Sequence, residues 1–364
     1  MTTIICRLGG LTAIVVLVAV LPGEQRALLL FGALTTAWQP LQTVVAGRQP
    51  EATTFTHPLA RTVLRTLALA AGSVALVIGM QAVVGHVDLF ALVSTAPRHG
   101  TRLMLPNVPQ LVPIAALEFV TFLQLDMTCE GRPFTRLPSR WRGWAALAAA
   151  TVITVAGYRL LVNWDAVPSA TRAAMGLADP HGPIPAGDLP VWLILVAAWQ
   201  VISRNLLDGW PGTVLPGPAG RIAVNNLVVL AGGTLTYLAL TAAGLTPATI
   251  AALGGCAVAG GRLVTDFLPR DRLPGQGRPG TGTLRAHSLR VASAAACTAG
   301  LYLVLLAAAT LGTFSHQPAG LWIAVVALNL ISGGITWQTG IIARGRRPGT
   351  VDQPAASESE PVLK

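Results

Sequence analysis

The chain has 364 residues, of which 52% are hydrophobic and only 11% are charged, and its formal net charge is +10. A soluble domain typically carries about 25% charged residues, so this composition excludes an ordinary water-soluble protein. The basic residues are spread over many short segments instead of forming one stripe, which argues against a nucleic-acid partner. The only lysine is Lys364, which excludes a phosphate-binding Walker A loop and a Schiff-base lysine.

Long apolar segments follow one another along almost the whole chain. About 20 helical residues cross a hydrocarbon core of about 30 Å, and backbone polar groups in lipid must pair within the chain. We therefore predict an all-α integral membrane protein with about ten transmembrane helices arranged as five hairpins. The predicted spans are 9–22, 27–46, 64–85, 110–127, 143–163, 190–207, 222–243, 248–264, 290–312 and 319–340. Residues 1–345 form one transmembrane domain in this prediction, and the polar segment 346–364 forms a disordered cytoplasmic tail.

The arginines fall mainly in alternate loops between these spans. If the N-terminus lies in the cytoplasm, the cytoplasmic loops hold most of the arginines and the outer loops hold few. Positively charged loops resist translocation, so this alternation predicts that both termini are cytoplasmic. We expect a multi-pass protein of the cell membrane, surrounded by the lipid bilayer. The long outer loops 86–109 and 164–189 are expected to be plain connectors, with a cap over the outer face or a lid as the alternatives.

The even-numbered spans end in related ways. Each gathers polar residues near its inner end and then breaks at Gly and Pro. The inner loops "RPFTRLPSRWRG" (132–143) and "WPGTVLPGPAGR" (210–221) share a Pro, a Leu-Pro four residues later and then an Arg. This pattern fits a hairpin repeated in parallel orientation, as in transporters, and it also fits the general preference of inner membrane boundaries for Trp, Arg, Gly and Pro.

The pattern of Leu-Pro followed by an arginine in these loops also resembles the inner loops of permease subunits of ATP-driven exporters. The resemblance covers only a short stretch, and five hairpins do not match the usual helix count of those subunits. We therefore assign no residue role from it.

Glu118 lies near the middle of the fourth predicted span. An ionised acid at that depth costs several kcal/mol, so its side chain is expected to face the protein interior. Helical spacing places Glu118, Phe122, Asp126 and Cys129 on one stripe. Two carboxylates about two turns apart suit a proton relay or a cation site. The alternative is a neutral Glu118 that is hydrogen-bonded between helices.

Further polar residues lie near the inner ends of the later spans. Each set alone fits a helix end anchored at the membrane surface, because charged pairs four residues apart neutralise each other and arginine reaches toward water. Together with Asp126, they are expected at a similar depth around the cytoplasmic half of one cavity. The side-chain amide of Asn329, in the middle of the tenth span, also needs a hydrogen-bond partner. The candidate proton- or cargo-binding residues are Glu118, Asp126, Gln200, Arg204, Asn205, Asp208, Arg262, Asp266 and Asn329.

No metal or other cofactor is expected, since no two histidines are four residues apart on a predicted helix. A transporter or permease for an unknown small molecule is the leading hypothesis, with Glu118 and Asp126 carrying protons and Arg204 and Arg262 meeting a polar or anionic group of the cargo. One alternative is a membrane-embedded enzyme acting on a lipid or isoprenoid, with Glu118 as general acid. Another is a non-catalytic subunit that works with a separate ATPase.

Overall fold

The computed structural model describes residues 108–175, 177, 179–267 and 281–311, together with positions 72, 75, 79, 320, 323, 324 and 326–328. This part of the chain is mostly helical, and five of its helices are long and apolar enough to cross a bilayer. Their membrane-length segments are Trp141–Leu161, Asp188–Leu206, Pro218–Ala242, Pro247–Thr265 and Ala286–Thr310. The predicted helical fold is thereby confirmed for the described residues, and the five apolar helices fit a membrane protein. The first two predicted spans, most of the third and tenth, and the tail lie outside the described residues.

The described helices follow one another as three hairpins. The first consists of α5 (Val108–Leu123), the π-helix η1 (Gln124–Thr128), the short 3-10 helix η2 (Phe134–Arg136) and α6 (Ser139–Leu161). The second consists of α8 (Asp188–Val201), the π-helix η3 (Ile202–Leu206), the 3-10 helix η4 (Gly212–Val214) and α9 (Pro218–Ala242). The third pairs α10 (Pro247–Phe267) with α11 (Thr281–Leu311). Between the first two lie β1 (Val162–Asn163), α7 (Ser169–Met175) and β2 (Ile184–Pro185).

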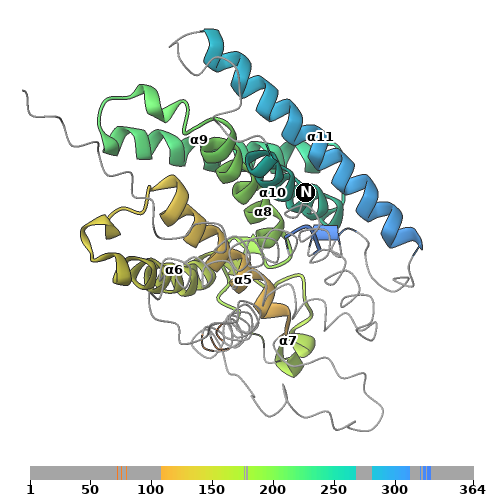
Figure 1. Cartoon of the computed structure of the whole chain (residues 1–364). Coiled ribbons are helices and arrows are strands. Elements are labelled where there is room, and N and C mark those ends of the chain that lie inside the picture. The colour runs from red at the N-terminus through yellow and green to blue at the C-terminus, as the bar shows by residue number, and fades with distance from the viewer. Residues whose placement is uncertain are drawn as a thin grey trace, which may run out of the picture.

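The first helix of each hairpin lies in the interior of the described bundle, and the second helix lies on its outside. Helix α8 packs against α5, α9 and α10, and it occupies the middle of the described bundle in Figure 1. Its apolar residues from Leu189 to Val201 are mostly buried. By contrast, α6, α9 and α11 carry exposed apolar side chains such as Val152, Leu235 and Val304. Exposed leucine and valine on a membrane-length helix are favourable against lipid, so these outer faces fit contact with the bilayer.

Helix α10 approaches its neighbours closely through glycines. A Cβ on Gly254 or Gly261 would meet side chains of α8, and a Cβ on Gly255 would lie 3.0 Å from the Cα of Ala324. On another side, a Cβ on Gly260 would lie 2.6 Å from Thr298 Oγ1 in α11. The dense glycine and alanine of this helix therefore allow three neighbours to pack against it at short distance.

Two elbows with the same backbone course follow α5 and α8. We call residues 124–138 the first elbow and residues 202–216 the second elbow. Each begins with a π-helical turn, closed by hydrogen bonds from Cys129 N to Gln124 O (2.8 Å) and from Leu207 N to Ile202 O (3.0 Å). Each then has an acidic residue and a glycine with positive φ, followed by a cis X-Pro bond. Glycine tolerates positive φ because it has no Cβ.

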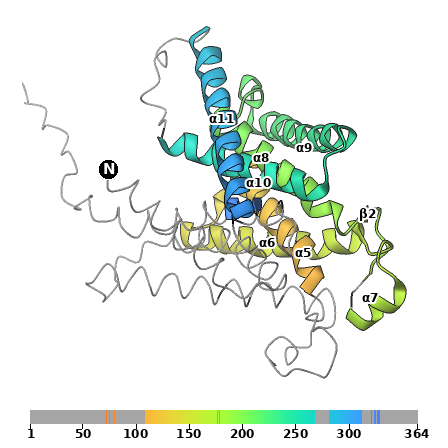
Figure 2. The same cartoon turned by 90° about the vertical axis from the view of Figure 1, so that its right-hand side faces the viewer.

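The segment between α6 and α8, which we call the cap, holds two short strands and the helix α7. Strands β1 and β2 pair in parallel, with Val162 opposite Ile184. The indole of Trp164 donates a hydrogen bond to the hydroxyl of Tyr158 (2.9 Å), and the Asn163 amide donates to Gly182 O (2.7 Å). In Figure 2 this cap, with α7, lies at one end of the bundle.

Candidate functional site

The ends of the second and third hairpins pack against each other. Leu206 at the end of η3, Val264 in α10 and Ala294 in α11 pack together in one buried cluster. The two elbows lie toward the left of Figure 1, while α7 lies near its bottom.

Each elbow holds an arginine of the next hairpin through its acidic residue. Glu130 in the first elbow accepts two contacts from Arg221 of α9, at 2.9 Å from Nε to Oε1 and 3.0 Å from Nη2 to Oε2. Asp208 lies at the equivalent place in the second elbow and accepts a hydrogen bond from Arg290 of α11 at 2.7 Å. His287 Nε2 lies 3.5 Å from the same Asp208 oxygen. These pairs join successive hairpins at the elbow end.

Asp126 and Arg204 form a second type of charged pair. Each is the third residue of its π-helical turn, so they occupy equivalent positions in the two elbows. They are close enough for electrostatic attraction, and both side chains are exposed. In the described part of the chain no ion pair joins either of them to a neighbour within 4 Å. Both charges therefore stay accessible to a solute.

Behind this pair a chain of amides crosses three helices. The buried Gln200 amide donates to Val120 O at 3.1 Å and to the side-chain oxygen of Gln124. The Gln124 amide donates in turn to the side-chain oxygen of Asn226 in α9. Asn226 donates to Ile222 O at 2.7 Å. Among the described residues, Gln200 Oε1 is buried without a hydrogen-bond partner. This acceptor in the series of amides can therefore take one more hydrogen bond.

Glu118 is fully buried, but it faces a different helix from Asp126. Its Oε1 accepts a hydrogen bond from Thr151 of α6 at 3.2 Å, and Phe122 packs against α6 as well. The expected single stripe from Glu118 to Cys129 is broken, because the wide π-helical turn after Leu123 rotates the following residues. Asp126 consequently lies near Arg204 of the second hairpin instead of continuing the face that packs on α6.

Of the remaining candidates, the structure describes the side chains of two. Asn205 is half-buried in η3, and Arg262 is half-buried in α10 near the level of the hairpin ends. The backbone of Asp266 belongs to the last turn of α10, but its side chain lies outside the description. Asn329 lies outside the described residues. Sequence reasoning did not identify Gln124 and Asn226 as a pair, or Arg221 and Arg290 as elbow partners, because these contacts join distant parts of the chain.

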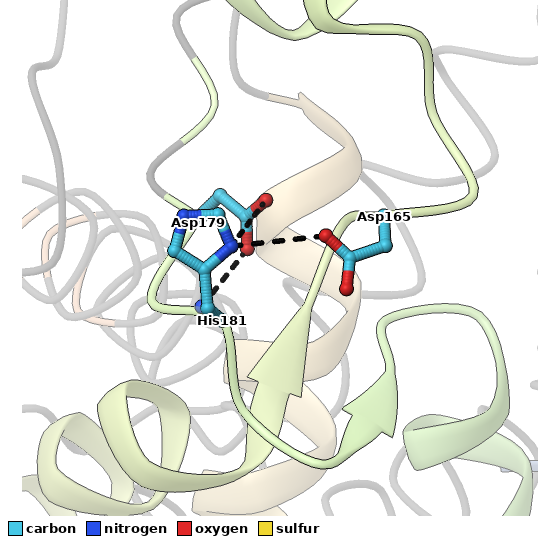
Figure 3. Close-up of side chains that lie close together, drawn as sticks. All are labelled: Asp165, Asp179 and His181. Carbon is cyan, nitrogen blue, oxygen red and sulfur yellow. Dashed lines mark hydrogen bonds and ion pairs between the residues drawn. The ribbon is translucent and has the colours of Figure 1, made fainter.

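A separate charged cluster lies in the cap (Figure 3). The potential ligand atoms of Asp165, Asp179 and His181 all lie within 4.8 Å of one another. The guanidinium of Arg172 binds Asp179 and lies 3.6 Å from Asp165, so a cation already occupies the centre of the acidic pair. We interpret this cluster as a structural element of the cap. No local pattern in the sequence marks this cluster, because α7 separates Asp165 from Asp179 and His181.

The acid stability of the cap should depend on Asp179. Burial alone would raise the pKa of Asp179, but hydrogen bonds from His181 N, Trp164 N and Arg172 outweigh it and hold the pKa below the usual value. A lowered pKa stabilises the fold above the ordinary aspartate range, and this contribution is lost as the pH falls through the folded pKa. The protection of residues 162–187 against hydrogen exchange, corrected for the intrinsic exchange rate at each pH, should therefore fall only at acidic pH. Asp179→Asn should give fast exchange already at neutral pH, and equal profiles for the two proteins would contradict this assignment.

Comparison with protein-family models found no match, and comparisons with curated proteins and with solved structures found none either. The functional argument therefore depends on the geometry of this chain.

Proposed function

We propose that this protein is a multi-pass transporter of the cell membrane that moves a small polar molecule. The proposed topology has about ten spans in five hairpins with both termini in the cytoplasm, as the arginine distribution favours. The observation that carries the proposal is the pair Asp126 and Arg204. Two opposite charges stay exposed and free of ion pairs within 4 Å, at equivalent breaks of two inner helices, while the acids next to them are bound to arginines.

The chemistry of this pair favours a cargo that carries both a cationic and an anionic group. Asp126 would accept hydrogen bonds from the cationic group, and Arg204 would donate to the anionic group. The open acceptor of Gln200 would offer a further hydrogen bond deeper in the bundle. Breaks in membrane helices, and π-helical turns in particular, are frequent at binding sites because they turn polar groups toward a solute.

The expected effect of removing either charge is a large loss of transport. Purified protein in liposomes would be tested with a labelled mixture of zwitterionic amino acids, with a labelled neutral sugar and a labelled dicarboxylate as comparisons. Asp126→Asn and Arg204→Gln should each lower amino-acid uptake by about tenfold, the result of losing one charge-assisted hydrogen bond. Asp165→Asn and Arg159→Gln are matched controls, since these residues lie at the opposite end of α6, and they should transport normally.

Other outcomes would replace the proposal. Normal uptake by both Asp126→Asn and Arg204→Gln would remove this pair as the cargo site. Chemical conversion of an added lipid or isoprenoid without any gradient would favour the membrane-enzyme alternative. Uptake that appears only when a separate ATPase is added would favour the subunit alternative.

Glu118 is the proposed proton carrier. It lies in the α5–α6 interface and contacts Thr151, so we propose that it acts by changing how α6 packs on α5, and not by direct contact with Asp126. Glu118→Gln should abolish uptake driven by a proton gradient and leave cargo exchange at equal pH intact. Thr151→Val, which removes the hydrogen bond but keeps the acid, should reduce the driven uptake only partly. If Glu118→Gln reduces driven uptake and exchange equally, the residue has a structural role instead.

A further inference from the structure

The first elbow presents an exposed basic and aromatic surface. We call it the elbow surface, and it consists of Arg132, Arg136, Trp141, Arg142 and Trp144, all of which are exposed. Trp141 is 51% exposed, which is unusual for so large an apolar side chain. A surface of this composition requires an explanation beyond the packing of the bundle.

The positive charge of the elbow surface is not neutralised by the described protein. Glu130 is the only acid between Met127 and Trp144, and Arg221 engages both of its carboxylate oxygens. None of the three arginines has an acidic partner among the described residues. Arg142 donates through Nε to Leu137 O at 2.7 Å, which holds its guanidinium in place and leaves both terminal nitrogens available.

The elbow surface lies where α6 enters the membrane. The membrane-length segment of α6 begins at Trp141, so Trp141 and Trp144 fall at the boundary of the hydrocarbon, where tryptophan is favoured. Arg132 and Arg136 precede this boundary and fall at the level of lipid headgroups. Leu137, which is also exposed between them, adds an apolar contact at the same depth.

The second elbow shows that this surface is not a requirement of the elbow fold. Its backbone follows the same course, yet Trp210 and Val214 stand where the first elbow has Arg132 and Arg136. Val214 is 72% exposed. The next arginine, Arg221, is bound by Glu130 and is not available to an outside group.

We propose that the elbow surface binds the phosphate headgroups of anionic phospholipids. Arginine forms two parallel hydrogen bonds to one phosphate, and three arginines within one elbow can share one or two headgroups while the tryptophans pack on the upper acyl chains. This proposal is independent of the transport proposal, because it concerns the outside of α6 and not the pair Asp126 and Arg204. Free inorganic phosphate offers the same chemistry without the lipid, so the experiment must separate the two sources.

The test uses the full chain in lipid nanodiscs made from phosphatidylcholine with a minor fraction of phosphatidylglycerol. The excess of phosphatidylglycerol retained around the protein is measured after extraction by mass spectrometry. Wild type should retain an excess that falls with added salt. The triple variant Arg132→Gln, Arg136→Gln, Arg142→Gln should lower it by more than the fivefold or so expected for losing one arginine near an anionic surface. Arg159→Gln, which removes one exposed arginine at the other end of α6, should leave it unchanged.

A gain-of-function variant keeps the test decisive even if the triple variant does not fold. Val214→Arg places an arginine in the second elbow at the position equivalent to Arg136, and it should increase the retained phosphatidylglycerol. An unchanged excess in the folded triple variant, or in Val214→Arg, would overturn the proposal. Complete displacement of the lipid by millimolar inorganic phosphate would assign the surface to soluble phosphate, and would also overturn it.

Discussion

Asp208→Asn is expected to lower the free energy of unfolding by about 3 kcal/mol, the lower end of the range for breaking a buried ion pair. The Arg290 side chain is only 3% exposed, so the substitution leaves a buried guanidinium without its carboxylate. The lower end applies because the Asp208 side chain is 34% exposed and water can reach part of the site. Asparagine tolerates the positive φ of 53° at this position, so the backbone of the elbow should be preserved.

Stability would be measured by unfolding in mixed detergent micelles with increasing SDS. The matched variant is Glu130→Gln in the other elbow, and it should cost less because its partner Arg221 is 33% exposed and water can replace the lost contact. Adding Arg290→Met to Asp208→Asn should recover part of the loss, since no buried charge then remains. The contrary result is that Asp208→Asn and Glu130→Gln lower stability equally, with no recovery on adding Arg290→Met. That result would show that burial gives the Asp208–Arg290 pair no special role in stability.

The sequence predicted those features that depend on local pattern. Apolar length predicted the helices, and the shared run of Pro, Leu-Pro and Arg lies in two loops, 132–143 and 210–221, whose elbows have the same backbone course. Each of these features is set by residues within a few turns of one another.

Irregular turns, and contacts between residues far apart in the sequence, were not predictable. The π-helical turn after Leu123 places Asp126 beside Arg204 and separates it from the face of Glu118, and no residue in "QLDMT" marks that extra width. The partner of Asp208 was expected within its own helix at Arg204, four residues earlier, but the elbow turns Asp208 toward Arg290 in another hairpin. Helical spacing fails at the point where the helix stops being regular, and in this chain the polar residues concentrate there.

Gly260→Ala is expected to destabilise the protein by about 2 kcal/mol, although alanine is the better helix former. The added Cβ would lie 2.6 Å from Thr298 Oγ1, 2.9 Å from Thr298 N and 3.1 Å from Ala294 O. Two of these atoms belong to the α11 backbone and cannot rotate away, so α10 and α11 must separate. That separation would weaken close packing along the interface, which supplies much of the association energy of membrane helices.

Gly300→Ala is the matched control, because it makes the same chemical change in α11 at a position where a Cβ would meet nothing within 4 Å. It should leave stability unchanged or raise it slightly, since only the helix propensity changes. SDS unfolding of the two variants would compare a closely packed glycine with an open one. If both behave alike, the glycines of α10 do not set its distance from α11. A loss confined to Gly260→Ala would further indicate that α10 and α11 of the third hairpin pack on each other through backbone contact.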